Sequence, residues 1–238
     1  MMDSKVIFFK GMPLFQKATF KPPFVLQGEL NETACFFYMM NGQMMSYDTR
    51  GVHQTSHKNA ILKNCGRYVQ EFLEDGKDDF CEAIAVFLYP DLLKEIYKKE
   101  VPSFLQVEKV SNPKKFIGNQ LIEQYMNNLS IYFEEPDSLD EELGILKLKE
   151  LMLILLKSEN HLSIRNLLSE IFTPVNIELK QAIENNLYNN LSMEQMAYLC
   201  HMSLSTFKRE FKKTFNDTPA HYITVSYTHL TLPTTPYV

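Results

Sequence analysis

The sequence is poor in cysteine and lacks any apolar run long enough to cross a membrane. None of the four cysteines, Cys35, Cys65, Cys81 and Cys200, forms a C-x-x-C pair, and most lie within apolar runs. This favours reduced, buried thiols in the cytosol over a redox switch. The longest apolar run, 151–156, is far too short to span a bilayer, and the first residues lack the apolar core of a signal peptide. We therefore expect a soluble, cytoplasmic protein without membrane contact.

The sequence also lacks catalytic motifs and an overall excess of basic charge. It carries no nucleophile motif, phosphate-binding loop or zinc pattern, so we expect no enzymatic activity, no cofactor and no metal. The formal net charge of −5 is unlike that of a stand-alone nucleic-acid-binding protein, and basic charge is instead local to one predicted helix. The densest acidic run is interpreted as the solvated start of a helix, where carboxylates interact favourably with the helix dipole. That run comprises Glu134, Glu135, Asp137, Asp140, Glu141 and Glu142.

Residues 191–223 predict two short helices around a tight turn. Ser192 and Gln195 match a capping box, and the chain breaks at His201, where a positive φ is expected. Ser203 can cap the second helix, and Asn216 can close it in the left-handed conformation. The apolar face of the second helix consists of Leu204, Phe207 and Phe211. Its solvent-facing side consists of Ser205, Lys208, Arg209 and Lys212.

This stretch has two interpretations. One is an amphipathic helical hairpin whose basic face is merely solvated, and the other is a helix-turn-helix that reads DNA. Between Ser203 and Thr214 four basic residues stand against one acidic residue, Glu210, which gives a local charge of +3. A basic face alone favours the solvated hairpin.

The stretch resembles the first helix-turn-helix of AraC/XylS-type transcription regulators. Asn216 stands where that family often has Gly. Together with the caps, the apolar spacing and the basic face, the resemblance favours DNA binding over the solvated hairpin. The matching residues are Leu191-Ser192, Met196-Ala197, Met202-Ser203, Ser205, Phe207, Arg209, Phe211-Lys212-Lys213, Asn216, Thr218-Pro219 and Tyr222-Ile223.

The resemblance implies that the exposed face of the second helix enters the major groove of double-stranded promoter DNA. Carried onto this sequence, it assigns base-edge contacts to Ser205, Lys208 and Arg209. Arginine paired with guanine through two hydrogen bonds is the commonest specific contact. Phosphate contacts, which position a protein without specifying sequence, are assigned to Lys212, Lys213 and Thr206.

The front half, residues 1–112, is rich in short apolar and aromatic runs broken by turn residues. Residues 34–47 predict a hairpin, because Asn41-Gly42 suits a two-residue turn between strands. Several short strands at this spacing suggest a small sandwich or barrel. In AraC-type regulators the front domain is commonly a cupin-like β-barrel, which this pattern resembles. Further elements are expected at 81–89 (strand, stopped by Pro90), 91–98 (helix) and 104–107 (strand).

Cupin enzymes hold a metal with clustered His and carboxylate ligands. The nearest candidates here are His53 and His57, which follow Arg50-Gly51 and are interpreted as loop residues. There is no H-x-H motif and no glutamate at suitable spacing. The sequence therefore does not favour a metal-dependent enzyme.

Residues 113–173 predict a helical linker, with helices at 114–129, 140–157 and 161–172. The broad apolar stripe of 140–157 must be covered by more than one neighbour. Packing against the barrel and a homodimer seam through 114–129 and 140–157 are both open interpretations. Residues 176–189 then supply the first helix of the DNA-binding unit, which spans 174–224.

Residues 225–238 contain no Lys, Arg, Asp or Glu and show no helical stripe. They resemble translated cloning sequence, and a natural β-rich tail is the alternative. The expected fold class is α+β: a cupin-like β-barrel or sandwich, a helical linker and an incomplete all-α helix-turn-helix domain. The expected function is sequence-specific DNA binding by a truncated transcription regulator. An unknown small molecule or protein is expected as a possible effector. The rival is an interaction module whose DNA unit is inactive.

Overall fold

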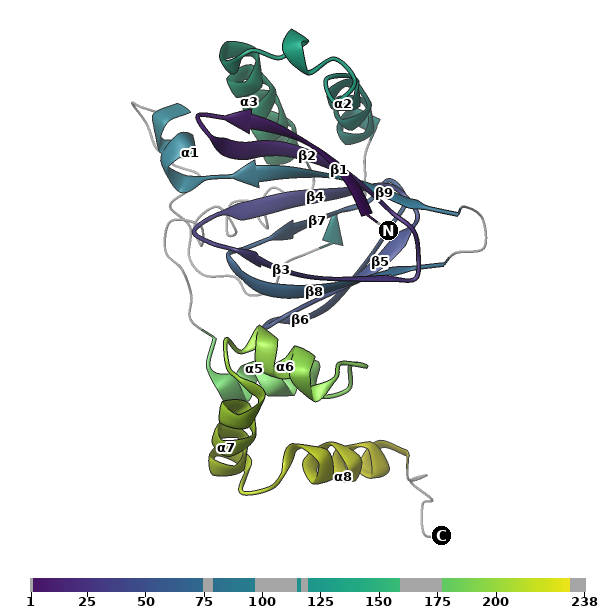
Figure 1. Cartoon of the computed structure of the whole chain (residues 1–238), viewed down its shortest axis with the longest axis vertical. Helices are drawn as coiled ribbons and strands as arrows, with labels where there is room; N and C mark the ends of the chain where they lie inside the picture. Colours follow the sequence, from purple (N-terminus) through teal and green to yellow (C-terminus); the bar gives the residue numbers. More distant parts are fainter. Residues whose placement is uncertain (1, 75–78, 97–114, 117–119, 159–176, 232–238) are drawn as a thin grey trace.

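The computed structural model describes residues 2–74, 79–96, 115–116, 120–158 and 177–231. Its strands form two antiparallel sheets, a large sheet of six strands and a small sheet of four (Figure 1). The large sheet runs in the order β1 (Met2–Phe9), β2 (Met12–Phe20), β9 (Cys81–Leu88), β4 (Ala34–Asn41), β7 (Ala60–Lys63) and β10 (Lys115–Phe116). The small sheet runs in the order β3 (Phe24–Leu30), β8 (Gly66–Leu73), β5 (Gln43–Asp48) and β6 (Gly51–Ser56).

The central strands of the large sheet are buried on both faces. Along β4, side chains alternate between two apolar clusters, and all residues from Ala34 to Met39 are buried. Cys35, Phe37 and Met39 face the small sheet, whereas Phe36 and Tyr38 face the helices on the other side. Because successive side chains of a strand point to opposite faces, such a run is apolar throughout. This explains why the sequence of β4 shows no polar alternation.

The predicted hairpin at Asn41-Gly42 is wrong. β4 pairs with β7 and β9 in the large sheet, whereas β5 pairs with β6 and β8 in the small sheet. The pairing of β4 with β9 shifts register between Met39 and Asn41, and Gly42 adopts a φ of 80°. The chain therefore turns a corner from one sheet to the other. A positive φ at glycine serves such a corner as well as a hairpin, so the local sequence could not separate the two.

Helices cover the outer face of the large sheet. They are α1 (Pro90–Ile96), α2 (Gln120–Ile131) and α3 (Glu141–Lys157), with a short 3-10 helix, η2 (Pro136–Ser138), between the last two (Figure 1). The strand at 81–89, its stop at Pro90 and the helix that follows are confirmed. Asp140 caps α3, because its carboxylate accepts a hydrogen bond from the Leu143 N–H at 2.8 Å. The acidic run thus precedes and opens a helix, as the sequence indicates.

The expected helix at 114–129 starts later than predicted. Residues 115–116 form β10, which pairs with β7 at the edge of the large sheet, and the helix begins at Gln120. The linker region thus contributes backbone to the sheet, because β7 offers an edge that local helix propensity does not register. The strand expected at 104–107, the helix expected at 161–172 and the boundaries near 112 and 173 lie outside the described residues.

Residues 177–231 contain α5 (Leu179–Asn186), α6 (Met193–Leu199), α7 (Leu204–Phe215) and α8 (Pro219–Thr231) (Figure 1). Residues 225–238 show no helical stripe in the sequence, yet α8 continues into them as far as Thr231. Pro219 stands in the first turn, where its missing N–H is harmless, and the Tyr222 N–H donates to the Thr218 carbonyl at 2.9 Å. Once started, the helix meets no proline before Pro233.

The fold is therefore α+β, with a β-rich region followed by helices. Its two sheets pack as a sandwich and are not closed into a barrel. The four cysteines are free thiols in this structure; Cys35 and Cys81 are buried, Cys200 is half-buried and Cys65 is exposed. None of the helices in the described part of the chain combines the length and apolar character that a bilayer span requires.

Candidate nucleic-acid interface

The first helix of the predicted pair is α6, and its N-terminus carries the capping box that the sequence indicates. The Gln195 N–H donates to the Ser192 hydroxyl at 3.2 Å, and the Ser192 N–H donates to the Gln195 side-chain oxygen at 2.7 Å. Both residues therefore satisfy backbone donors that a helix start leaves without partners.

The turn after α6 is closed by a residue in the left-handed conformation. His201 has a φ of 56°, and its N–H donates to the Tyr198 carbonyl at 3.0 Å. The Met202 N–H donates to the Ala197 carbonyl at 3.0 Å. These two bonds form a Schellman motif, which ends a helix and redirects the chain. The positive φ predicted at His201 is confirmed.

The second helix, α7, begins and ends at the predicted residues. The Ser203 hydroxyl accepts from the Thr206 N–H at 3.2 Å, and Asn216 closes the helix with a φ of 52°. Phe207 and Phe211 are fully buried. They pack with Ile183, Met196 and Ala197, so α7 is fixed against α5 and α6 by one face.

The opposite face of α7 is exposed and basic. Ser205, Lys208, Arg209, Lys212 and Lys213 are all exposed. Positions 205, 208, 209 and 212 recur at helical spacing and therefore share one side of the helix. The structure thus brings the predicted base-edge and phosphate candidates together on one surface.

Thr206, the remaining predicted contact, lies differently. It is half-buried, and its hydroxyl accepts a hydrogen bond from the Ser203 hydroxyl at 2.9 Å. The side chain is engaged at the helix cap rather than displayed with the lysines.

Glu210 also lies on this surface. From the sequence it entered only the local charge balance, and its ion pairs were not predicted. Its carboxylate accepts from Arg209 Nε at 3.2 Å and from Lys213 Nζ at 3.0 Å. These two hydrogen bonds hold the pKa of Glu210 below its usual value. The bond from Lys213 makes the larger contribution and the bond from Arg209 the next. Among the described residues, Lys208 and Lys212 have no ion pair. The spacing of Glu210 and Lys213, one helical turn apart, was a signal that could have indicated the pairing.

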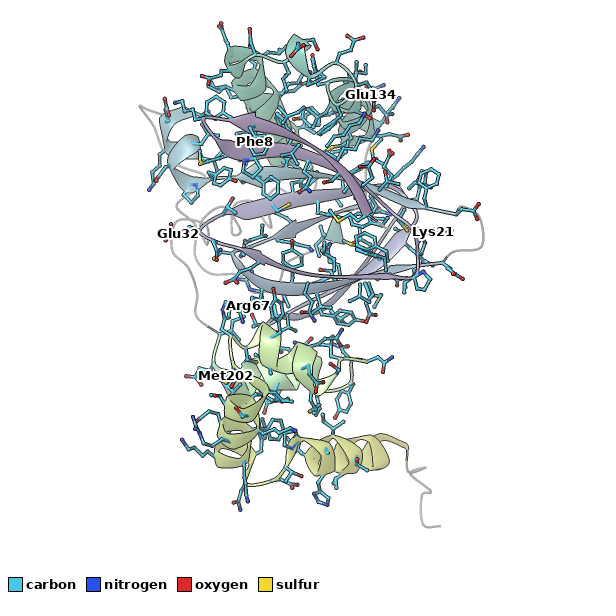
Figure 2. The ribbon with its side chains drawn as sticks, in the orientation of Figure 1. Phe8, Lys21, Glu32, Arg67, Glu134 and Met202 are labelled. Carbon is cyan, nitrogen blue, oxygen red and sulfur yellow. The ribbon has the colours of Figure 1, made fainter. Side chains whose placement is uncertain are left out.

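The helix-turn-helix unit also docks on the outer face of the small sheet, a contact that no local pattern predicts. Leu199 of α6 packs on Tyr47 and Val69, and Asn186 Nδ2 of α5 donates to the Asp48 carbonyl at 2.7 Å. Arg67 of β8 pairs with Glu29 and places its guanidinium 4.8 Å from the Tyr198 ring centre. Figure 2 labels Arg67 and Met202, which lie on the two sides of this junction. α7 projects away from it, and its basic face stays exposed (Figure 1).

Of the two histidines considered as metal ligands, His57 lies in a turn, as expected, whereas His53 does not. His53 lies within β6, opposite Ser46 of β5, and not in a loop. Burial lowers the pKa of its imidazole. The described residues contain no group of three or more His, Cys, Asp or Glu side chains arranged to bind a metal ion.

Two family matches divide the chain between them. Residues 34–167, more than half of the chain, match the ExsA N-terminal regulatory domain. Residues 183–224 match the bacterial regulatory helix-turn-helix proteins of the AraC family. The chain belongs to the AraC-type regulators. It is therefore a DNA-binding transcription regulator, as the resemblance of residues 191–223 implies.

Solved structures resemble this AraC-type chain at low identity. ToxT from Vibrio cholerae O395 is 11% identical, with a TM-score of 0.43 over 93% of this chain and 96% of ToxT. A cupin 2 barrel protein from Leptotrichia buccalis is 13% identical, with a TM-score of 0.32 over 37% of this chain and 40% of that protein. A search of curated proteins gives no match. The family assignment rests on the two domain matches.

Proposed function

We propose that α7 is the recognition helix and that Ser205, Lys208 and Arg209 contact base edges in the major groove. The observation that carries the proposal is the division of α7 into two faces. One face is locked into the core through Phe207 and Phe211, and the other is basic and exposed. A helix that is held rigidly by one face can present the other face to a DNA groove. Binding then costs little conformational entropy, because the helix is already ordered.

Phosphate contacts are proposed for Lys212 and Lys213, with a smaller part for Thr206, whose hydroxyl is engaged with Ser203. Lysines near the end of a helix suit sequence-independent positioning. A single unit with few phosphate contacts should bind weakly and with strong salt dependence. A regulator of this kind acts where its promoter DNA is, in the bacterial cytoplasm.

The test is fluorescence anisotropy with promoter fragments and their single-base variants. Arg209→Ala should reduce discrimination at one base position by about 1–3 kcal/mol, because an arginine–guanine contact is lost. Lys212→Ala should weaken binding to all fragments and reduce the salt dependence, since it removes a phosphate contact. Lys94→Ala, on α1 and far from this helix in the chain, is the control. Unchanged base preference in Arg209→Ala contradicts the assignment of that residue.

We also propose a homodimer through α2 and α3, within the predicted regions 114–129 and 140–157. Both helices pack on the large sheet, yet each leaves large apolar side chains exposed: Leu121, Ile131, Leu146 and Leu153. Leu146 and Leu153 are seven residues apart on α3 and therefore share a face. A second DNA-binding unit brought by dimerisation raises the affinity of a weak single unit.

Light scattering after gel filtration tests the dimer. The double variant Leu146→Glu and Leu153→Glu should shift the chain to the monomer mass, because it places charge on the proposed seam. Glu141→Gln and Glu142→Gln, at the exposed start of the same helix, form the control. A monomeric wild-type chain at all concentrations contradicts the proposal.

We also propose that an effector binds the β-sandwich. The helix-turn-helix unit contacts the small sheet directly, so a ligand bound in the sandwich can influence it. The rival function, an interaction module with an inactive DNA unit, is separated by a gel shift. Retarded promoter DNA at low salt supports DNA binding by this chain. No retardation at any protein concentration supports the module.

A further inference from the structure

Lys63 is a charged residue in the interior of the sandwich. It is the last residue of β7 and lies two positions after Ile61, so the two side chains point to the same face of the strand. Ile61 belongs to the apolar cluster between the two sheets. Only 5% of the residue is exposed. Its ammonium has no hydrogen-bond partner within the described structure. Burial of a charged amine without a hydrogen bond is energetically costly. A lysine at such a position is therefore a candidate functional residue.

The immediate surroundings of the amine are aromatic. Lys63 Nζ lies 4.1 Å from the ring centre of Tyr68 and 5.2 Å from that of Phe37. Ring faces attract a cation but cannot replace hydrogen-bond acceptors. The charged or titratable groups around the amine are Cys35 on β4, Tyr68 on β8, Asp48 at the end of β5, and Arg50 and His53 toward β6.

A cavity of about 50 Å³ lies beside Lys63, between the two sheets. Its wall is mainly apolar, and it includes the exposed Met2, so the cavity reaches the surface. Gln70 is a second polar residue on the wall. Its side-chain N–H donates to the Met44 sulfur at 3.0 Å, and a thioether is a weak acceptor. The residues that line the cavity thus include a buried lysine, an amide whose donor is poorly satisfied, and apolar side chains such as those of Phe37 and Phe87.

We propose that this cavity binds a short-chain monocarboxylate, with the carboxylate on Lys63 and Gln70 and the alkyl end among the aromatic and alanine side chains. A carboxylate supplies the acceptors that Lys63 lacks and a better acceptor than sulfur for Gln70. Since one water needs roughly 10–15 Å³, the cavity holds about four water-sized groups, which fits acetate or propionate. The proposal deepens the effector part of the proposed function. Its test does not involve DNA, so the two can fail separately.

The proposal has a defined pH dependence. Burial lowers the pKa of Lys63 to about 7, and a carboxylate should bind the protonated amine. Burial raises the pKa of Cys35 to about 12 and also raises that of Tyr68, whereas it lowers that of His53. These three groups therefore keep one charge state between pH 7 and pH 9. The apparent Kd should rise about 50-fold over that range, as the protonated fraction of Lys63 falls from about one half to about one hundredth.

Isothermal titration calorimetry of the full chain with sodium propionate at pH 7 tests the site, with sodium chloride at equal ionic strength as reference. Measurement in two buffers of different ionisation enthalpy should show uptake of about half a proton per propionate bound. Lys63→Met, similar in volume but uncharged, should raise the Kd at least about tenfold, because a charge-assisted hydrogen bond is lost. Lys94→Met, which removes a half-exposed lysine on α1, is the matched control.

Several outcomes would overturn the proposal. Propionamide is the neutral isostere of propionate, and equally tight binding of the two would show that Lys63 does not recognise the carboxylate charge. Equal Kd values for Lys63→Met and wild type would place the site elsewhere. Tighter binding of decanoate than of propionate would refute the short-chain assignment. If Lys63→Met fails to fold, as judged by circular dichroism, the proton uptake and pH profile of the wild-type chain decide the matter.

Discussion

The two outer faces of the sandwich are covered in different ways. On the large sheet, α2 and α3 join a continuous apolar cluster that includes Ile122, Met126, Leu148 and Leu151. On the small sheet, α5 and α6 make a small apolar contact centred on Leu199, and polar bonds complete it. The first interface has the character of a protein core, and the second resembles an interface between domains.

The contrast bears on regulation. A helix layer that shares a core with its sheet unfolds with it, whereas a unit held by few apolar contacts and several hydrogen bonds can separate at moderate cost. The unit on the small sheet is the one that carries the basic face of α7. The fold therefore places the DNA-binding helix on the more separable side.

Replacement of a core leucine on α3 should have the largest effect. Leu151 is fully buried, and Leu151→Ala should lower the free energy of unfolding by about 2–5 kcal/mol, since it leaves a cavity under the helix. Urea denaturation followed by circular dichroism measures this. Glu142→Gln, at the exposed start of the same helix and outside the proposed seam, should change stability by less than about 1 kcal/mol. Equal effects of the two variants would remove the distinction between core and surface on α3.

The space between the sheets is predicted to respond to pH. Lys63→Met should raise the free energy of unfolding at pH 6 by about 1–4 kcal/mol, because it removes a buried charge. The pKa of Lys63 is about 7 in the folded chain and ordinarily 10.5. The cost of the lysine is thus complete below pH 7 and shrinks as pH rises toward 10.5, so the gain should be smaller at pH 9. Urea titrations at both pH values check this, and a gain that grows with pH contradicts it.

The junction on the small sheet should respond more mildly. Arg67→Ala removes the pairing with Glu29 and the contact with Tyr198, and should weaken docking by about 1 kcal/mol. Hydrogen exchange read by mass spectrometry should show faster exchange in α6 and little change in α3. Lys10→Ala, which removes an exposed ion pair on the far side of the sandwich, is the control. Faster exchange in both helices would indicate that the two interfaces are one cooperative unit.

The smallest effect is expected on α7 itself. Glu210→Gln frees Arg209 and Lys213 from their shared carboxylate and removes one negative charge from the basic face. Affinity for promoter DNA should rise about two- to fivefold, with a steeper dependence on salt, because two cations become available to phosphates. Anisotropy titrations at several salt concentrations measure this. A fall in affinity would mean that Glu210 holds Arg209 in its binding position.

Much of the DNA-binding unit could be predicted from the sequence. The caps at Ser192 and Ser203, the left-handed residues at His201 and Asn216 and the two faces of α7 all depend on neighbours within a few positions. Short-range hydrogen bonds and helical spacing depend only on residues that are close in the sequence, so both can be predicted from it. The same holds for the strand β9, which ends before Pro90, and for the cap of α3 at Asp140.

Contacts between distant segments were decided only by the tertiary structure. The sequence around Asn41-Gly42 determined a turn, but the choice between a hairpin and a corner depended on which strands lay beside β4 and β5. Burial of Lys63, docking by Arg67 and Asn186 and the pairing of β10 with β7 likewise join residues far apart in the chain. The sequence by itself determined caps, helix faces and the DNA-binding family, because short-range bonds set them. The sheet topology and the lysine within the sandwich came from long-range packing, which no local pattern encodes.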